Sequence, residues 1–173
     1  MWYCAEVLKN IAFIDGQNLY MGTIRNDWKI DHEKFRVYLK DKYNVENAYY
    51  FMGYFSDKEE KLYIKLETAG FKLIFFFHNF LMNSLKKGNV DSDIIFNVMK
   101  NLADKVDFNK VVIVSGDGDY FPLIEYLIEK NRFCKIMFPN RSFASSLYKK
   151  LSNEYFVYLD RADIRVTIEV SRK

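Results

Sequence analysis

Three short acidic motifs carry the residues that could do chemistry in this chain. Residues 15–18 read DGQN, residues 87–93 read KGNVDSD, and residues 115–119 read SGDGD. Carboxylates gathered from such motifs would repel one another, and some would take up protons unless a cation lay between them. Oxygen ligands with no His or Cys nearby in sequence suit Mg²⁺ or Mn²⁺. The motifs therefore predict an acidic site that holds a divalent metal ion.

Each motif also has a purely structural interpretation. Asp15 with its glycine could form a plain turn after a strand, and Asp119 could cap the next helix. Asp91 and Asp93 could favour a helix N-terminus through the helix dipole. The coincidence of the motifs at one predicted edge of a sheet favours a site instead. Because Asp91 and Asp93 lie two positions apart on a helix, at most one of them faces that site.

The elements that must position these motifs alternate between strand and helix. Apolar runs predict strands, and capped or helically spaced stretches predict helices. The expected strands lie at residues 10–14, 45–55, 71–77, 111–114, 133–138 and 156–159. The expected helices lie at residues 31–43, 57–69, 91–106, about 122–130 and 142–151. The segment 161–173 is left unassigned.

This alternation, with strands that are apolar on both faces, predicts an α/β fold. We expect a three-layer sandwich, in which helices cover both faces of a mainly parallel central sheet. Such sheets bind their ligands at the carboxyl ends of the strands. Two of the three acidic motifs follow strands directly, so the fold itself would bring them to one edge.

Composition limits the class of protein. The chain has 173 residues without repeats or linkers, so we expect a single domain over residues 1–173. A net charge of +3 and a pI of about 8.7 permit an RNA partner without demanding one. Aromatic residues make up 18%. We interpret them mainly as core residues, with a base-stacking surface as the alternative.

No membrane, secretory or histidine-based function is expected. The chain contains no run of 18 apolar residues and no signal-peptide pattern at its start. Cys4 and Cys134 form no metal-binding spacing, and we expect Cys134 to be a buried structural thiol in a reducing, cytoplasmic setting. His32 should face solvent after a helix cap, and His78 should end an apolar strand, so neither is assigned to chemistry.

The motifs, taken with their neighbours, resemble the NYN domain family, which is related to PIN-type nucleases. The chain is most similar to the LabA-like branch of that family. The resemblance is carried by FIDGQNL at residues 13–19, KGNVD at 87–91 and VSGDGDYFPL at 114–123. It covers about residues 9–160, and SGDGD followed by an aromatic residue and Pro-Leu is its most specific part.

The resemblance implies a PIN-like, Rossmann-like fold and metal-dependent ribonuclease activity with Mg²⁺ or Mn²⁺. It implies that Asp15, Asp91 and Asp117, with Asp119 as a candidate fourth member, form the acidic centre. Our hypothesis for the mechanism is that the metal binds between Asp15, Asp91 and Asp117, and that Asp119 orients a water molecule or completes the metal's shell. It also selects Asp91 over Asp93. The supporting residues that it implies are Asn18, which would orient the first aspartate, and Ser115 at a strand end.

One departure keeps a second function open. Related sequences often carry another acidic residue about two turns into the helix that begins at Asp91, where this chain has Asn97. The loss of one charge would weaken a second metal ion, so the alternative is a weak or inactive module that binds RNA or protein. A phosphotransferase or phosphatase with an aspartyl nucleophile is disfavoured because Gln17 stands where a second aspartate is needed. A nucleotide-binding Rossmann domain is disfavoured because GxGxxG and GKS motifs are absent.

Basic residues near the motifs are candidate contacts for RNA phosphates. These candidates are Lys86, Lys87, Arg141, Lys149 and Lys150. A solvated lysine face is the alternative for each of them. The segment 79–87 is expected to be a loop that faces the substrate. A homo-oligomer is also open, because aromatic residues such as Trp2, Tyr3 and Trp28 could serve an interface.

Overall fold

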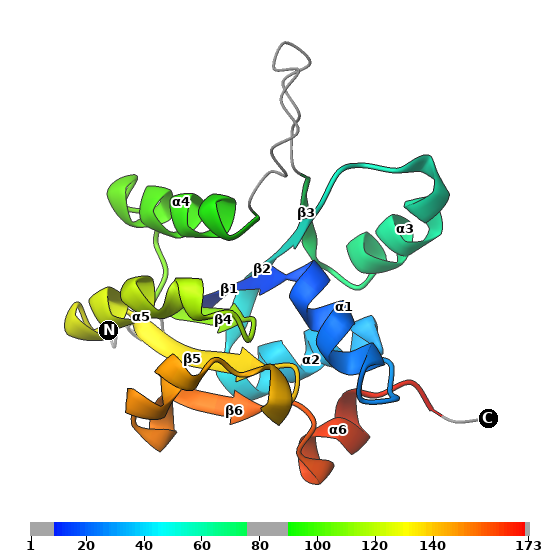
Figure 1. The fold of residues 1–173 in the computed structure, drawn as a ribbon. Helices are drawn as coiled ribbons and strands as arrows, with labels where there is room; N and C mark the ends of the chain where they lie inside the picture. Colours follow the sequence, from blue (N-terminus) through cyan, green and yellow to red (C-terminus); the bar gives the residue numbers. More distant parts are fainter. Residues whose placement is uncertain (1–8, 76–89, 172–173) are drawn as a thin grey trace, which may run out of the picture.

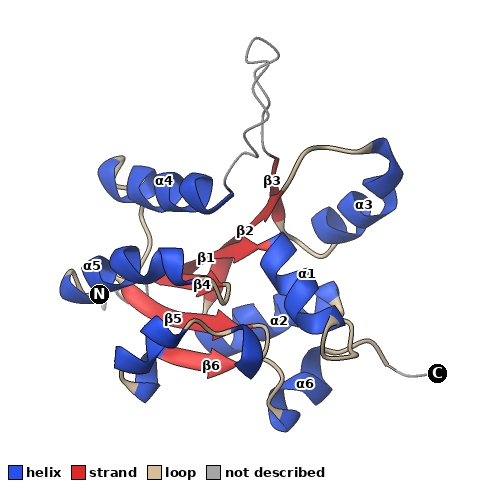
Figure 2. Ribbon diagram, viewed as in Figure 1, coloured by secondary structure: helices blue, strands red, loops and turns tan. Residues whose placement is uncertain are grey.

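The computed structural model describes residues 9–75 and 90–171, drawn in Figures 1 and 2. Six strands in these residues form one sheet in the order β3-β2-β1-β4-β5-β6. The strands are β1 (Asn10–Asp15), β2 (Val45–Met52), β3 (Lys72–Phe75), β4 (Val111–Val114), β5 (Phe133–Phe138) and β6 (Phe156–Tyr158). Every neighbouring pair is parallel, so the expected α/β fold is confirmed, and the sheet is parallel throughout rather than mainly so.

Helices cover both faces of the sheet. In the described residues these are α1 (Gly16–Ile24), α2 (His32–Tyr43), α3 (Glu60–Thr68), α4 (Val90–Ala103), α5 (Phe121–Glu129) and α6 (Ala162–Ile168). Short 3-10 turns lie at η1 (Asp57–Glu59), η2 (Gly118–Tyr120), η3 (Arg141–Phe143), η4 (Ser146–Lys150) and η5 (Asn153–Tyr155). None of these helices combines the length and apolar character that crossing a membrane requires.

The core has two halves because successive side chains of a strand point to opposite faces of the sheet. On β1, Ala12 and Ile14 belong to a cluster with residues of α1, α2, α3 and α6. Ile11 and Phe13 belong to a second cluster with residues of α4 and α5. Figure 2 shows α4 and α5 on one side of the strands and α1, α2 and α6 on the other. These are the three layers expected from the sequence.

The strand order places a topological switch point between β1 and β4. The chain runs outward from β1 to β3 and then returns to pair β4 with β1, with Ile14 opposite Val114. Connections leave the carboxyl ends of β1 and β4 in opposite directions, and ligands of open α/β sheets bind in the crevice that results. Asp15, the last residue of β1, and Ser115, which follows β4, lie at this point.

Helix α1 was not expected from the sequence. No helix is predicted directly after the strand at residues 10–14, whereas α1 begins at Gly16. The Asp15 side chain caps this helix by accepting a hydrogen bond from the backbone N–H of Asn18. Leu19, which is fully buried, anchors the helix to the sheet. Tertiary burial and the cap therefore make a helix from a segment with little periodic pattern.

The helix expected at residues 142–151 is wrong. The chain there forms the two separate 3-10 turns η3 and η4, because Ala144 and Ser145 have extended backbone with ψ angles of 123° and 143°. The unassigned tail contains α6, whose Ile168 oxygen accepts a hydrogen bond from the Asp31 backbone N–H at 2.8 Å. The tail therefore packs against the start of α2.

Several smaller expectations need correction. The strand expected at 45–55 ends at Met52, and the strand expected at 71–77 covers Lys72–Phe75, with 76–77 outside the described residues. Trp28 is buried and cannot serve an exposed interface, while Trp2, Tyr3, Cys4 and His78 lie outside the described residues. His32 is half-buried rather than solvent-facing, and Cys134 is a free, half-buried thiol.

Candidate active site

Asp15 occupies the centre of the candidate site. Its side chain is only 6% exposed, because it lies at the end of the central strand β1. Its Oδ1 accepts a hydrogen bond from the Asn18 backbone N–H at 2.9 Å. Its Oδ2 lies 3.4 Å from both the Ser115 hydroxyl and the Tyr120 hydroxyl. Residues from both sides of the switch point therefore surround one buried carboxylate.

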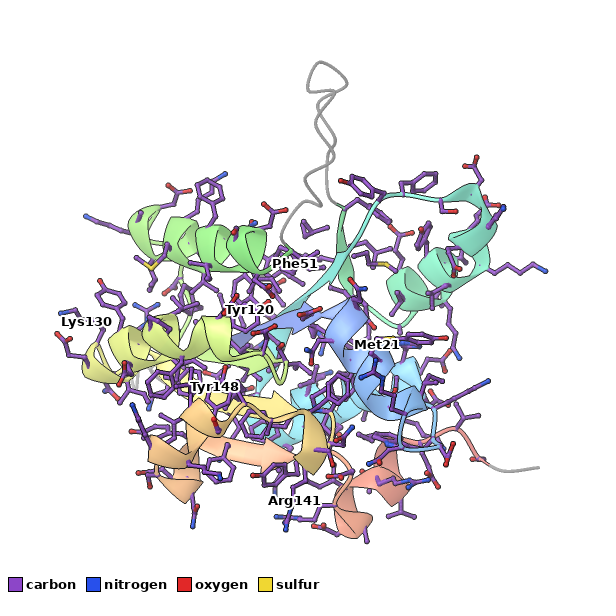
Figure 3. All side chains as sticks on the ribbon, viewed as in Figure 1. Met21, Phe51, Tyr120, Lys130, Arg141 and Tyr148 are labelled. Carbon is purple, nitrogen blue, oxygen red and sulfur yellow. The ribbon has the colours of Figure 1, made fainter. Side chains whose placement is uncertain are left out.

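Tyr120 connects this carboxylate to a second one. Its hydroxyl donates a 2.5 Å hydrogen bond to Oδ1 of Asp91, which lies in the first turn of α4. The Tyr120 side chain is fully buried, and Figure 3 shows it in the middle of the molecule between α4 and α5. Sequence reasoning missed this residue. Its only signal was the aromatic position after the SGDGD motif.

The turn that follows β4 carries the remaining acidic residues. The Asp117 backbone N–H donates to the Ser115 hydroxyl at 3.1 Å, and the Asp119 N–H donates to Oδ1 of Asp117 at 3.0 Å. The hydroxyl of Tyr148 donates to the main-chain oxygen of Asp117. Asp117 is half-buried and Asp119 is exposed, so the acidic site opens to solvent on this side.

Asn18 and Gly116 hold the two turns together. The Asn18 side-chain oxygen accepts a hydrogen bond from the Gly116 N–H at 2.8 Å. A Cβ atom at Gly116 would lie 2.1 Å from the main-chain oxygen of Phe143, so only glycine fits beneath the segment after β5. Ser145 closes the same contact by donating its backbone N–H to the Gly116 oxygen at 2.9 Å.

The pKa values reflect carboxylates crowded together. Burial, with a smaller contribution from the charges of Asp91 and Asp117, raises the pKa of Asp15 to about 6, against the opposing hydrogen bonds from Asn18 and Ser115. Burial also raises the pKa of Asp91, with contributions from the charges of Asp117 and Asp119 that oppose the hydrogen bond from Tyr120. The charges of Asp91 and Asp117 therefore act on Asp15, and those of Asp117 and Asp119 act on Asp91.

The carboxylate oxygens of Asp15, Asp91, Asp117 and Asp119 suit a hard divalent cation in their chemistry and in their charge. Such oxygens are the ligands that Mg²⁺ and Mn²⁺ prefer, and a cation would offset the burial and the repulsion that together raise the pKa of Asp15. In residues 9–75 and 90–171, however, no three His, Cys, Asp or Glu side chains are grouped so that they could together hold a metal ion. The Tyr120 hydroxyl lies between the carboxylates of Asp15 and Asp91.

Asp93 and Asn97 contact each other within α4. Burial alone raises the pKa of Asp93, with no contribution from another carboxylate. The Asn97 side chain donates a 2.8 Å hydrogen bond to the Asp93 main-chain oxygen within α4. Of the two aspartates on this helix, the one that meets Tyr120 is Asp91. Asn97 therefore uses its amide inside its own helix.

The predicted phosphate contacts divide into three groups. Lys149 and Lys150 are exposed on η4, directly after Tyr148, which contacts the Asp117 turn. The Arg141 guanidinium lies 5.0 Å from the centre of the Tyr158 ring, over β6 rather than over the acidic turns. Lys86, Lys87 and the predicted substrate-facing loop at 79–87 lie outside the described residues.

His32 stands apart from the acidic site. Its ring packs edge-on against Tyr50, with the ring centres 6.0 Å apart. Burial lowers the pKa of His32 to about 4, so the ring is neutral at pH 7. This placement gives no support to a role in proton transfer at the aspartates.

The parallel sheet, its strand order and the carboxylates at the switch point define a Rossmann-like α/β protein with an acidic site. The chain belongs to the NYN domain family, whose model matches residues 10–160. This family is a family of PIN-like nucleases. The match spans all three acidic motifs, and the resemblance expected from the sequence is thereby confirmed.

Two individual proteins are similar to this chain. The low amplitude and bright protein LabA of Synechococcus elongatus is 25% identical over 170 residues, which cover 93% of this chain and 88% of that protein. A crystal structure of a protein of unknown function from Vibrio parahaemolyticus matches with a TM-score of 0.75 and 19% identity, over 96% of this chain and 99% of the other. The second likeness shows the shared fold alone.

Proposed function

We propose that this protein is a ribonuclease that uses Mg²⁺ or Mn²⁺ to hydrolyse phosphodiester bonds of RNA. The observation that carries the proposal is the meeting of the Asp15 and Asp91 carboxylates at the Tyr120 hydroxyl, beside the Asp117 turn. These residues lie at the switch point of a sheet in a chain of a nuclease family. RNA as the substrate class rests on that family alone.

In this mechanism Asp15, Asp91 and Asp117 would hold the metal ion. When bound, such an ion would activate a water molecule and would neutralise charge that develops on the phosphodiester oxygens. Asp119, which is exposed at the rim of the site, orients the attacking water. Lys149 and Lys150 bind the RNA phosphates next to the acidic turn. Asn18 and Ser115 hold Asp15 in place.

A binding module without turnover is the second candidate. The observation that favours it is that, among the described residues, no three His, Cys, Asp or Glu side chains are grouped so that they could hold a metal ion. The amide at Asn97, which is engaged within α4, adds no charge to replace the acidic residue of related sequences. Such a module would bind RNA or a protein through the same edge of the sheet and would leave the RNA intact.

The test is cleavage of a mixed, end-labelled RNA pool with Mg²⁺, with Mn²⁺ and with a chelator. Wild type is compared with Asp15→Asn, Asp117→Asn and the control Asp41→Asn, which makes the same chemical change on the exposed face of α2. We expect metal-dependent cleavage by wild type and the control only. Cleavage that survives in the two site variants would contradict the mechanism. A folded wild type that cleaves with neither metal would favour the binding module.

A further inference from the structure

Tyr120 links the three parts of the fold that carry the proposed metal ligands. Its main chain ends η2, the turn that begins next to Asp117. Its ring lies in the core half that α4 and α5 cover. Its hydroxyl reaches the carboxylates of Asp15 on β1 and Asp91 on α4. One residue therefore touches, or is continuous with, all three elements that supply the proposed ligands.

The hydroxyl does not serve the two carboxylates equally. A tyrosine hydroxyl carries one proton, so it can donate one full hydrogen bond at a time. The distances of 2.5 Å to Asp91 and 3.4 Å to Asp15 assign that proton to Asp91. Asp15 is oriented instead by the Asn18 backbone N–H at 2.9 Å. The contact with Tyr120 therefore acts mainly on the carboxylate of α4.

Asp91 comes from a different kind of element than the other proposed ligands. Asp15 ends a buried central strand, and Asp117 lies in a turn held by Ser115 and Tyr148. Asp91 lies in the first turn of α4, a helix that packs against one face of the sheet. A buried, rigid ring at Tyr120 fixes where the Asp91 carboxylate meets the end of β1.

We propose that Tyr120 is a positioning residue for the metal site, and that its hydroxyl holds Asp91 where Asp91 and Asp15 can bind one divalent cation together. The inference rests on the proposed metal-dependent function, whose metal ligands it explains. Outer hydrogen-bond partners of metal ligands typically change metal affinity by about 10- to 100-fold when they are removed. Tyr120 would act through Asp91 and would touch neither water nor RNA.

The test measures Mn²⁺ binding directly, by electron paramagnetic resonance of the free ion, together with cleavage. Tyr120→Phe keeps the buried ring and removes only the hydroxyl. We expect its Mn²⁺ affinity to fall by about 10- to 100-fold, while the cleavage rate recovers at saturating Mn²⁺. Tyr63→Phe is the control, since Tyr63 is also buried and its hydroxyl accepts a 3.1 Å bond from the Ser56 N–H, away from the carboxylates. Its affinity should equal that of wild type.

A double-mutant cycle shows whether the effect passes through Asp91. In an Asp91→Asn background, Tyr120→Phe should change Mn²⁺ affinity no further. Unchanged or tighter Mn²⁺ binding by Tyr120→Phe would overturn the inference, as would an equal loss in the Asp91→Asn background. A wild type that binds no Mn²⁺ would also overturn it.

The nuclease proposal fails separately from this inference. A wild type that binds Mn²⁺ but cleaves no RNA would refute the nuclease, and the binding measurements would still decide the role of Tyr120.

If Tyr120→Phe did not fold, Asp91→Glu would replace it. That variant keeps the charge on a half-buried turn and extends the carboxylate past the hydroxyl. The same loss of affinity is expected, and wild-type affinity would overturn the inference.

Discussion

The side-chain oxygen of Asn18 accepts a hydrogen bond from the backbone N–H of Gly116 at 2.8 Å, across 98 positions of sequence. The backbone N–H of the same Asn18 donates to Asp15 at 2.9 Å. One residue therefore orients the first aspartate and ties it to the turn that carries Asp117. The two strand-end motifs form a single unit through this residue.

Asn18→Ala should destabilise the fold. The change leaves the Gly116 N–H without its partner in a part-buried place, which typically costs about 1–3 kcal/mol of unfolding free energy. Urea denaturation measures this. Asn26→Ala is the control, because the Asn26 side chain makes only an exposed 3.3 Å bond to Asp160. Equal stability of the two variants would show that the link between the turns contributes little.

Asp15→Asn should stabilise the metal-free protein at pH 7.5. The pKa of Asp15 is raised from 3.8 to about 6, so folding takes up a proton between these values. The stability of wild type therefore falls as pH rises from about 4 through 6 and is level above that. The cost at pH 7.5 is at most about 3 kcal/mol. Asparagine keeps the helix cap and removes the charge.

Urea denaturation at pH 4.5 and 7.5, with chelator present, measures this pH dependence. The difference between Asp15→Asn and wild type should be larger at pH 7.5. Asp41→Asn on the exposed face of α2 controls for the general effect of removing one negative charge. An Asp15→Asn variant less stable than wild type at pH 7.5 would mean that the buried charge is already compensated without metal.

Mn²⁺ should raise the unfolding temperature of wild type, and more at pH 7.5 than at pH 5. Asp15 must lose its proton to bind the ion, and its raised pKa makes that loss incomplete at pH 5. An ion at 100 times its dissociation constant adds about 2.7 kcal/mol of stability. Thermal unfolding with Mn²⁺ or chelator measures the effect. An equal stabilisation of Asp117→Asn would place the ion elsewhere.

Gly116→Ala should disturb the segment after β5. The new Cβ would lie 2.1 Å from the Phe143 main-chain oxygen, so the backbone must move. Forcing a methyl group into such a packed place typically costs about 1–3 kcal/mol. Gly53→Ala is the matched control, since a Cβ there meets no atom within 4 Å. Chemical denaturation of both variants should separate them, and equal stabilities would contradict the tight packing.

Lys149→Gln with Lys150→Gln should weaken RNA binding without changing metal affinity. Each lost phosphate contact should reduce the slope of log affinity against log salt by about 0.7 for a single strand. Lys40→Gln with Lys42→Gln on α2 removes the same charge from another helix. Binding of labelled RNA across a salt series measures both pairs. If the Lys149/Lys150 variant had the same slope as the Lys40/Lys42 variant, the lysines of η4 would be solvated residues that do not contact RNA.

The sequence was sufficient for the architecture because strands and helices alternate with clear patterns. It placed Asp15 and Asp117 at one edge through the rule that parallel strands share their carboxyl ends. It missed α1, where the cap at Asp15 and the burial of Leu19 decide the helix. It also missed Tyr120, whose contact with Asp91 spans 29 positions and depends on how η2 packs against α4. The local sequence pattern does not indicate which residues of distant segments will contact each other.

Asp15 is at once the last residue of β1 and the cap of α1. No loop separates the proposed ligand from the helix, so any change in the charge on Asp15 is felt by the amide proton of Asn18, 2.9 Å from N to Oδ1. The chemical shift of that one amide should therefore follow both acid titration and ion binding. The Asn18 amide signal would report both the protonation of Asp15 and the binding of an ion to it.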